Sequence, residues 1–132
     1  MEKVIIHVDY EDNFQAWLKE LAGCVAVGDT MEDLQHNIKE SISMHLEGMR
    51  EDEETIPAAF NGQYELEYKL NTRALLKYSS NTVKMSAISE ITGIAPQVLS
   101  HYASGVRNAS EKVRTKIVFA LHRLGKELLT VE

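Results

Sequence analysis

The residues able to support catalysis are scattered along the first half of this 132-residue chain. Metal-dependent hydrolysis would need several carboxylates that converge on one or two ions. The candidates by position are Asp9, Asp29, Glu40 and Glu47. Each has a simpler role: Asp29 precedes a helix whose unpaired amides favour negative charge, and the others lie at a charged turn or on a solvated helix face. We therefore predict no catalytic residue; the alternative is a degenerate or active nuclease.

Histidine and cysteine give no stronger signal. His36 and His45 are nine residues apart on one expected helix, about 13 Å along its axis, which is too far to share a metal. His7 is expected at the half-buried face of a strand. Cys24 lies in an apolar strand with no basic neighbour in sequence, which favours an inert core thiol over a nucleophile. We predict neither a metal site nor a cofactor.

Residues 85–105 have the spacing of two short helices joined by a sharp turn, as in a helix-turn-helix. The apolar positions of this pair are Ile88, Ile94, Leu99 and Tyr102. Gly93 suits the end of the first helix because that position requires a positive φ. Pro96 suits the first turn of the second helix, where no amide hydrogen is needed. The second helix is therefore expected to present one polar face to solvent.

That polar face carries side chains that could read a DNA major groove. They are Gln97, Ser100, His101 and Ser104. Gln can pair bidentately with adenine, and Ser can bond either base type. The residues expected to hold phosphates follow in the chain and are Arg107, Asn108, Lys112 and Arg114. The alternative is a small helical bundle with an ordinary polar face.

Periodicity predicts the elements that position these residues. Strands are expected at residues 3–10, 14–18, 24–27 and 64–70, and helices at 31–49, 72–78, 84–92, 96–103 and 110–129. The third strand is a continuous apolar run, which predicts that both of its faces are covered. Thr30 and Asp33 form a capping box at the start of the first helix. Residues 50–62 are acidic or turn-forming and are expected to be a solvated connection.

The charge reverses near residue 70, where the expected strands give way to helices. Residues 1–70 hold 16 Asp and Glu against 5 Lys and Arg, a net charge of −11, whereas residues 71–132 hold 4 against 9, a net charge of +5. An acidic half suits a basic partner, and a basic half suits nucleic acid. We predict an α+β chain with two domains, residues 1–70 and 71–132.

Composition narrows the class of protein further. With 44% hydrophobic and 26% charged residues, the chain is not expected to be disordered. No stretch approaches the ~18 consecutive apolar residues of a membrane span, and the first residues do not resemble a signal peptide. The single cysteine cannot form an internal disulfide. We therefore expect a cytoplasmic protein without a membrane partner.

The run TGIAPQVLSHYASGVR, residues 92–107, resembles the repressor-type helix-turn-helix family. Two positions depart from the family pattern. Ser89 stands where the family usually has Ala, and Ala95 stands where a Ser or Thr normally caps the second helix. The missing cap lowers the expected stability of that helix by about 1 kcal/mol.

The run LAGCVAVGDTMEDLQHNIKESISMHLEGMREDEETIP, residues 21–57, resembles the HicB-type antitoxins of prokaryotic toxin-antitoxin pairs. Their pattern is L-P-G-C, then G-D-T, an amphipathic helix ending H-L-E, and an acidic loop before I-P. Every element is present in order except the proline, which Ala22 replaces. The element order β-β-β-α-β of this half also resembles a truncated ribonuclease H fold.

The HicB resemblance implies an N-terminal half that binds and inactivates a small basic toxin of the HicA type, an RNA-cleaving protein of double-stranded-RNA-binding fold. It implies a C-terminal half that binds the operator DNA of its own operon. The toxin contacts are not fixed by the sequence, and the acidic candidates are Asp9, Glu11, Asp12, Glu65 and Glu67. A half with a net charge of −11 suits a cationic RNA-binding partner.

A homodimer or higher homo-oligomer is expected, because one recognition helix reads only a few base pairs. The last helix carries more apolar surface than a single small bundle can cover, and this excess is the expected contact. Its apolar residues form one stripe, Val113, Ile117, Ala120, Leu121, Leu124 and Leu128, with Val118, Phe119 and Leu129 outside it. The alternative function is a stand-alone helix-turn-helix transcription factor whose first domain senses a ligand or drives assembly. The operator sequence is left open.

Overall fold

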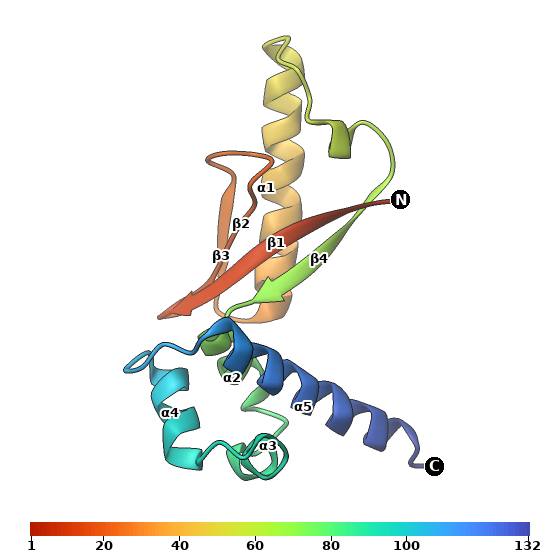
Figure 1. Cartoon of the computed structure of the whole chain (residues 1–132). Helices are drawn as coiled ribbons and strands as arrows, with labels where there is room; N and C mark the ends of the chain where they lie inside the picture. Colours follow the sequence, from red (N-terminus) through yellow and green to blue (C-terminus); the bar gives the residue numbers. More distant parts are fainter. The chain divides into compact units, whose positions relative to one another are not determined.

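Alternating apolar and polar residues build a four-stranded sheet in the first part of the chain (Figure 1). Its strands are β1 Glu2–Glu11, β2 Asn13–Trp17, β3 Val25–Gly28 and β4 Tyr64–Leu70. The order across the sheet is β3-β2-β1-β4; β1 and β4 are parallel, and the other neighbours are antiparallel. β3 and β4 are therefore the two edges of the sheet.

The helix α1, Met31–Glu51, covers one face of this sheet and lies behind it in Figure 1. Thr30 caps the helix as predicted, since its hydroxyl accepts a hydrogen bond from the Asp33 amide at 3.1 Å. Four apolar residues on one side of the helix are buried: Leu34, Ile38, Ile42 and Leu46. The helix approaches the end of β3 so closely that a Cβ on Gly28 would lie 2.5 Å from the Leu34 nitrogen. Only glycine fits there.

The tight turn before β3 forms although it lacks a proline. The Cys24 amide donates to the Leu21 carbonyl at 3.1 Å, and Gly23 has a φ of +83°. This bond together with a positive φ at the third residue is typical of a type II turn. The Ala22 departure therefore leaves the turn intact.

Two sequence expectations about the first part of the chain are wrong. β3 is not covered on both faces, because α1 covers only one face of the sheet; Val25 and Val27 are 61% and 52% exposed. The connection before β4 is not wholly solvated. It contains the short 3-10 helix Ala58–Phe60, and the buried Phe60 ring meets Tyr64 edge-on at 4.8 Å.

The rest of the chain is all-α, as predicted. Its helices are α2 Thr72–Ser79, α3 Met85–Thr92, α4 Pro96–Ser104 and α5 Glu111–Leu129. Asn71 caps α2 by accepting from the Ala74 amide, and Ser110 caps α5 by accepting from the Val113 amide. The helices share one buried cluster: Leu76, Ile88, Leu99, Tyr102, Ile117 and Ala120.

The computed structural model describes residues 1–132 and divides into two compact units, Met1–Leu70 and Asn71–Glu132. The division falls where strand gives way to helix and where the net charge changes sign. None of the helices has the length and apolar character that a membrane span requires.

Candidate functional site

The turn between α3 and α4, residues 93–95, is held by backbone geometry and by one hydroxyl. Gly93 has a φ of +75°, a conformation that other residues rarely adopt. The Thr92 hydroxyl donates to the Ile88 carbonyl at 2.8 Å and accepts from the Ile94 amide at 3.2 Å. Thr92 was not singled out in the sequence, although a hydroxyl one residue before a turn glycine is a usable signal. These bonds fix the direction in which α4 leaves the turn.

α4 presents a polar face because its apolar residues are held in the core. Leu99 and Tyr102 are buried in the cluster described above. The predicted reading residues Gln97, Ser100 and Ser104 are exposed, whereas His101 is half-buried. The Ser104 hydroxyl donates to the His101 carbonyl at 3.2 Å, so it is partly engaged by its own helix. Gln97 and Ser100 are the freest side chains on this face.

The first turn of α4 has no side-chain cap. Ala95 occupies the N-cap position and accepts no hydrogen bond through its side chain, and Pro96 occupies the first helical position. The amides of the next residues therefore depend on water or on an external acceptor. Exposed amides at a helix start are a favourable position for an anion such as a phosphate.

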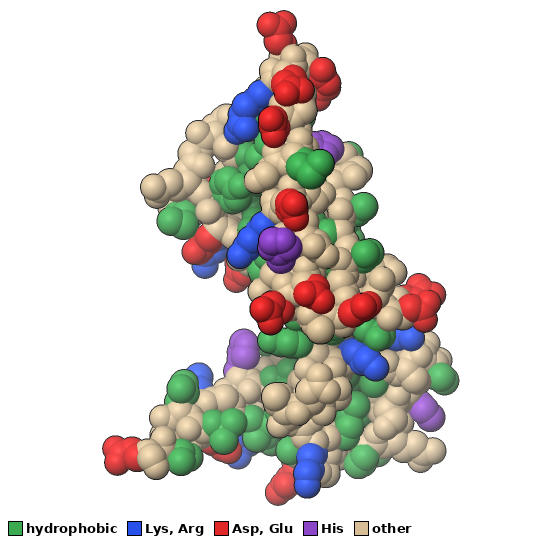
Figure 2. Space-filling model, turned by 180° about the vertical axis from the view of Figure 1, so that it is seen from behind, with side chains coloured by type: hydrophobic (Ala, Val, Ile, Leu, Met, Phe, Trp, Pro, Cys, Tyr) green, Lys and Arg blue, Asp and Glu red, His purple; other side chains and the backbone are tan.

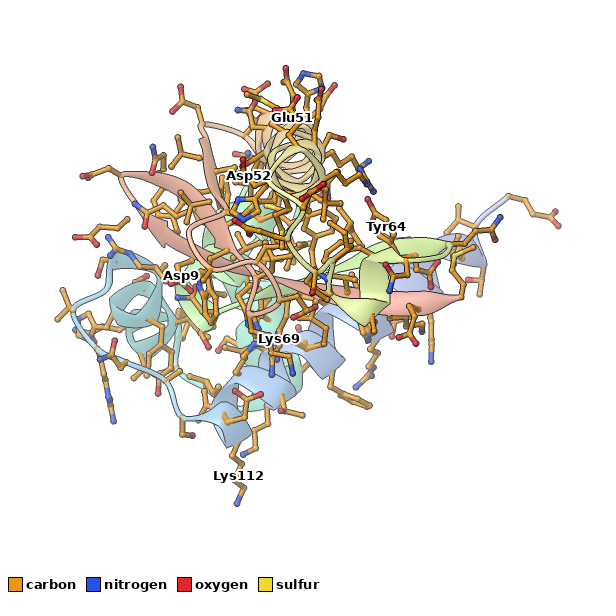
Figure 3. All side chains as sticks on the ribbon, turned by 90° about the horizontal axis from the view of Figure 1, so that it is seen from above. Asp9, Glu51, Asp52, Tyr64, Lys69 and Lys112 are labelled. Carbon is orange, nitrogen blue, oxygen red and sulfur yellow. The ribbon has the colours of Figure 1, made fainter.

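The four residues predicted to hold phosphates are not equivalent. Arg107, Asn108 and Lys112 are exposed, and Lys112 extends away from α5 (Figure 3). The Arg107 guanidinium lies 5.9 Å from the centre of the Tyr102 ring. The Arg114 side chain is only 16% exposed, and its Nη1 lies 3.5 Å from Glu111 Oε1. Arg114 is therefore less suited to phosphate contact than the sequence suggested.

The five acidic residues predicted to contact a toxin are all exposed, but the structure does not bring them together. Asp9, Glu11 and Asp12 lie at the β1–β2 hairpin. Glu65 and Glu67 lie on β4, where Glu65 pairs with Lys3 of β1. Asp9 is six residues after Lys3 on β1, so it lies about 20 Å away from the Glu65 position along the strand. Figure 3 shows Asp9 at the opposite end of the sheet from Tyr64.

Acidic side chains also gather along the exposed face of α1 (Figure 2). The exposed residues include Glu32, Asp33, Glu40, Glu47 and Glu51. The negative charge of this unit is therefore spread over the helix, the hairpin and β4. No single acidic patch identifies a contact by itself.

The face of the sheet opposite α1 exposes aromatic and apolar side chains. The His7 ring stacks on Trp17 with 4.3 Å between ring centres, and Val25 is the cross-strand neighbour of Trp17. Sequence reasoning missed Trp17. Its exposure was predictable, because strand alternation places Trp17 on the face opposite the buried Ala16 and Leu18. This open face is a second surface available to a partner.

The titratable groups of the first unit do not form a metal centre. No three His, Cys, Asp or Glu side chains in the chain are placed to hold a metal ion. His36 lies 3.4 Å from Glu40 on the surface of α1. Cys24 is buried, with its Sγ 3.4 Å from the Ser41 hydroxyl. Burial raises the pKa of the Tyr68 phenol, whose hydroxyl is buried without a hydrogen-bond partner.

Comparison with known proteins adds two findings. A family model described as the HicB-like antitoxin of bacterial toxin-antitoxin systems matches residues 3–118, which spans most of both units. An uncharacterized 14.9 kDa protein from the rep-hol intergenic region of Haemophilus phage HP1 (strain HP1c1) is 41% identical over 46 residues. That alignment covers 35% of this chain and 35% of the phage protein, about a third of the relative's length.

Proposed function

The chain belongs to the HicB-like antitoxin family of bacterial toxin-antitoxin systems, and from this premise we propose that it inactivates a small basic, RNA-cleaving toxin of the HicA type and represses its own operon. The family is regulatory and non-catalytic, and an antitoxin has a toxin as its partner. We assign toxin binding to residues 1–70 and operator binding to residues 71–132.

The observation that carries this assignment is the charge of the two units. The boundary between them, Leu70 to Asn71, coincides with the change from a net charge of −11 to +5. An acidic unit attracts a cationic RNA-binding protein and competes with the RNA for its surface. A basic unit supplies the counterion-release term that drives association with DNA. Each unit therefore suits one of the two partners and repels the other.

We assign the first unit to a partial ribonuclease-H-like fold. The support is its element order β-β-β-α-β together with the sheet order β3-β2-β1-β4 and the parallel pairing of β4 with β1. In this assignment the fold serves as a binding scaffold and not as a nuclease. RNA cleavage that required Mg²⁺ and disappeared in an Asp9→Asn variant would overturn it.

In the second unit, α3, the turn at residues 93–95 and α4 form the proposed helix-turn-helix. α4 would enter the major groove with Gln97 and Ser100 towards the bases, and Lys112 and Arg107 would bind phosphates. The uncapped start of α4 supports this placement, because its amides could bond a phosphate oxygen.

We propose a homodimer that places two such helices on a two-fold symmetric operator. The exposed apolar residues of α5 and the chain end support this: Phe119, Leu128, Leu129 and Val131. The second half of α5 also extends beyond α3 and α4 (Figure 1). Light scattering should give a dimer at micromolar concentration, and a Phe119→Glu variant should shift it towards monomer. A wild-type monomer would contradict the proposal.

Separating the two units tests the assignment of function. Each unit has its own buried core, so residues 1–70 and residues 71–132 can be expressed alone. The first fragment should neutralise the toxin and leave operator DNA unshifted, and the second should do the reverse. Fragments that exchanged these activities would refute the division of labour. A chain that bound its operator but no toxin would favour the stand-alone transcription factor.

A further inference from the structure

The β4 edge of the sheet has unpaired backbone groups. The Glu2 amide donates to the Gln63 carbonyl at 3.3 Å, and the hydrogen bonds of a parallel pair engage alternate residues. The backbone of Glu65 therefore faces β1, whereas the amide and carbonyl groups of Leu66 and Tyr68 face away from the sheet. β4 pairs with no other strand, so these groups form an open template for another extended chain.

A groove of about 450 Å³ runs beside this edge, between β4 and α1. β4 lines it with Tyr64, Leu66 and Tyr68, and α1 contributes Ile42 and Ser43. Apolar and aromatic walls suit the side chains of an added strand, since every second side chain of that strand would point to this face.

The groove also contains an unsatisfied donor. The Tyr68 hydroxyl is buried and has no hydrogen-bond partner. A buried hydroxyl without a partner carries a free-energy cost that an incoming acceptor would relieve. Rotation of the Tyr68 ring towards a docked segment would let the hydroxyl donate to a carbonyl of that segment, which would relieve a defect already present in the free chain.

The other edge of the sheet is protected against strand addition. The Asn37 side-chain amide donates to the Val27 carbonyl at 2.8 Å, and the Ser41 hydroxyl donates to the Val25 carbonyl at 3.2 Å. Side chains of α1 therefore already occupy backbone acceptors of β3. Only β4 is left to accept a further strand.

We propose that the β4 edge is the docking site for an extended basic segment of a partner protein, which adds to the sheet as a fifth strand. Only the identification of that partner as a toxin rests on the proposed function. The net charge of −11 on residues 1–70 selects a basic occupant. On the strand itself, Glu65 and Glu67 are exposed together with Lys69, Lys3 pairs with Glu65, and Lys39 lines the groove. A strand from a second copy of this unit would bring a net charge of −11 with it and be repelled.

Amide hydrogen exchange on the full chain, resolved by NMR, tests the geometry with a defined probe. The probe is a blocked heptapeptide of alternating lysine and valine. The amides of Leu66 and Tyr68 should exchange on the order of tenfold more slowly with the peptide, and those of Glu65 and Glu67, already bonded to β1, should not change. A peptide with glutamate in place of lysine, and one N-methylated at every second residue, should give no protection. Failure of the lysine peptide to slow Leu66 and Tyr68 overturns the proposal.

Two kinds of variant separate docking from folding. Tyr68→Phe should leave the fold at least as stable, because it removes the unsatisfied hydroxyl, and should weaken peptide binding several-fold. Glu67→Gln should weaken binding and reduce its salt dependence, whereas Glu11→Gln, the same charge change at the hairpin, should not. Equal losses for Glu67→Gln and Glu11→Gln would mean that the peptide senses only net charge, and the edge would be the wrong site.

Replacing the peptide by an inactive HicA-type toxin distinguishes the two proposals. Protection of Leu66 and Tyr68 by the toxin supports both. If the toxin binds but protects the open face around Trp17 instead, edge docking is wrong for the toxin and the antitoxin function stands. If the toxin does not bind, the proposed function is wrong, and the peptide result still decides whether the edge accepts a basic strand.

Discussion

The two units present their surfaces to partners in different ways. In the second unit, the candidate contacts are side chains on one face of α4 and in the segment that follows it, and each is positioned by the helix that carries it. In the first unit, the candidate surfaces are the open face of the sheet and the β4 edge, which exist only because distant strands pair in the order β3-β2-β1-β4. Local periodicity therefore determines the surface of the basic unit, and long-range pairing determines that of the acidic unit.

The largest expected effect tests whether the two cores are independent. Leu99→Ala should lower the stability of the second unit by about 2–5 kcal/mol, because Leu99 is fully buried. Trp17 is the only tryptophan and lies in the first unit, so its fluorescence reports the unfolding of that unit alone. The unfolding transition seen by Trp17 fluorescence should therefore be the same in the Leu99→Ala variant and in the wild type. Circular dichroism should show that the helices of the second unit unfold before the first unit does. Operator binding should fall, while toxin binding should persist.

The matched control places the same kind of substitution in the core of the first unit. Leu34→Ala should shift the Trp17 transition by a similar amount and spare operator binding, because Leu34 is fully buried in the first unit. If either change shifted both transitions equally, the cores would be coupled and the comparison between the units would fail.

The next effect sharpens the assignment within the second unit. Gln97→Ala should cost about 1–3 kcal/mol on the operator and much less on random DNA, since base contacts carry the sequence information. Lys112→Ala should weaken binding to both duplexes, and should lower the slope of log affinity against log salt concentration by about one unit. Arg114→Ala should change the slope less, because this side chain is only 16% exposed and its Nη1 lies 3.5 Å from Glu111 Oε1. Salt titrations on operator and scrambled duplexes measure all three, and equal losses on both duplexes for Gln97→Ala would show that α4 reads no bases.

Helix caps provide a smaller contrast between the units. Thr30→Ala should lower the stability of the first unit by about 1 kcal/mol, because it removes the acceptor for the Asp33 amide. Ala95→Ser should raise the stability of the second unit by a similar amount. If a DNA phosphate uses the free amides of α4, the added hydroxyl competes with it, so operator affinity should not rise with stability. Thermal melts and operator titrations of Ala95→Ser decide this point.

The smallest expected effect concerns the turn before β3. Ala22 holds the position of a type II turn at which proline is favoured, so Ala22→Pro should stabilise the first unit by about 0.4–1 kcal/mol. Gly23→Ala at the neighbouring positive φ should destabilise it instead. Denaturant unfolding followed by Trp17 fluorescence measures both changes. A destabilising Ala22→Pro would show that the turn is of another type.

Most element positions were predictable because each is marked by local chemistry. Thr30, Gly93 and Pro96 mark helix ends, and the structure places helix boundaries at all three. The exposure of Gln97 and Ser100 followed from the burial of Leu99 by helical periodicity alone. These signals require no knowledge of the tertiary fold.

The features that sequence analysis misjudged depend on tertiary surroundings that no local pattern encodes. Cys24 to Val27 is apolar throughout, which is equally consistent with a central strand and with an edge strand that has one exposed apolar face. The sheet order makes β3 an edge, and Val25 is exposed because α1 covers only the other face of the sheet. Likewise, the partnering of Arg114 with Glu111 depends on side-chain conformations that charge counting does not reveal. The groove at β4 requires both α1 and the strand order, so no local pattern could predict it.

The hydrogen bonds from Asn37 and Ser41 to the β3 backbone have a consequence for valency. A sheet with two open edges can add an extended segment on each side. Because one edge is blocked, a complex formed through β4 would have a fixed stoichiometry of one added strand per chain. Releasing the Val27 carbonyl by Asn37→Ala is therefore expected to raise the number of basic peptides bound per chain above one, without loss of the fold.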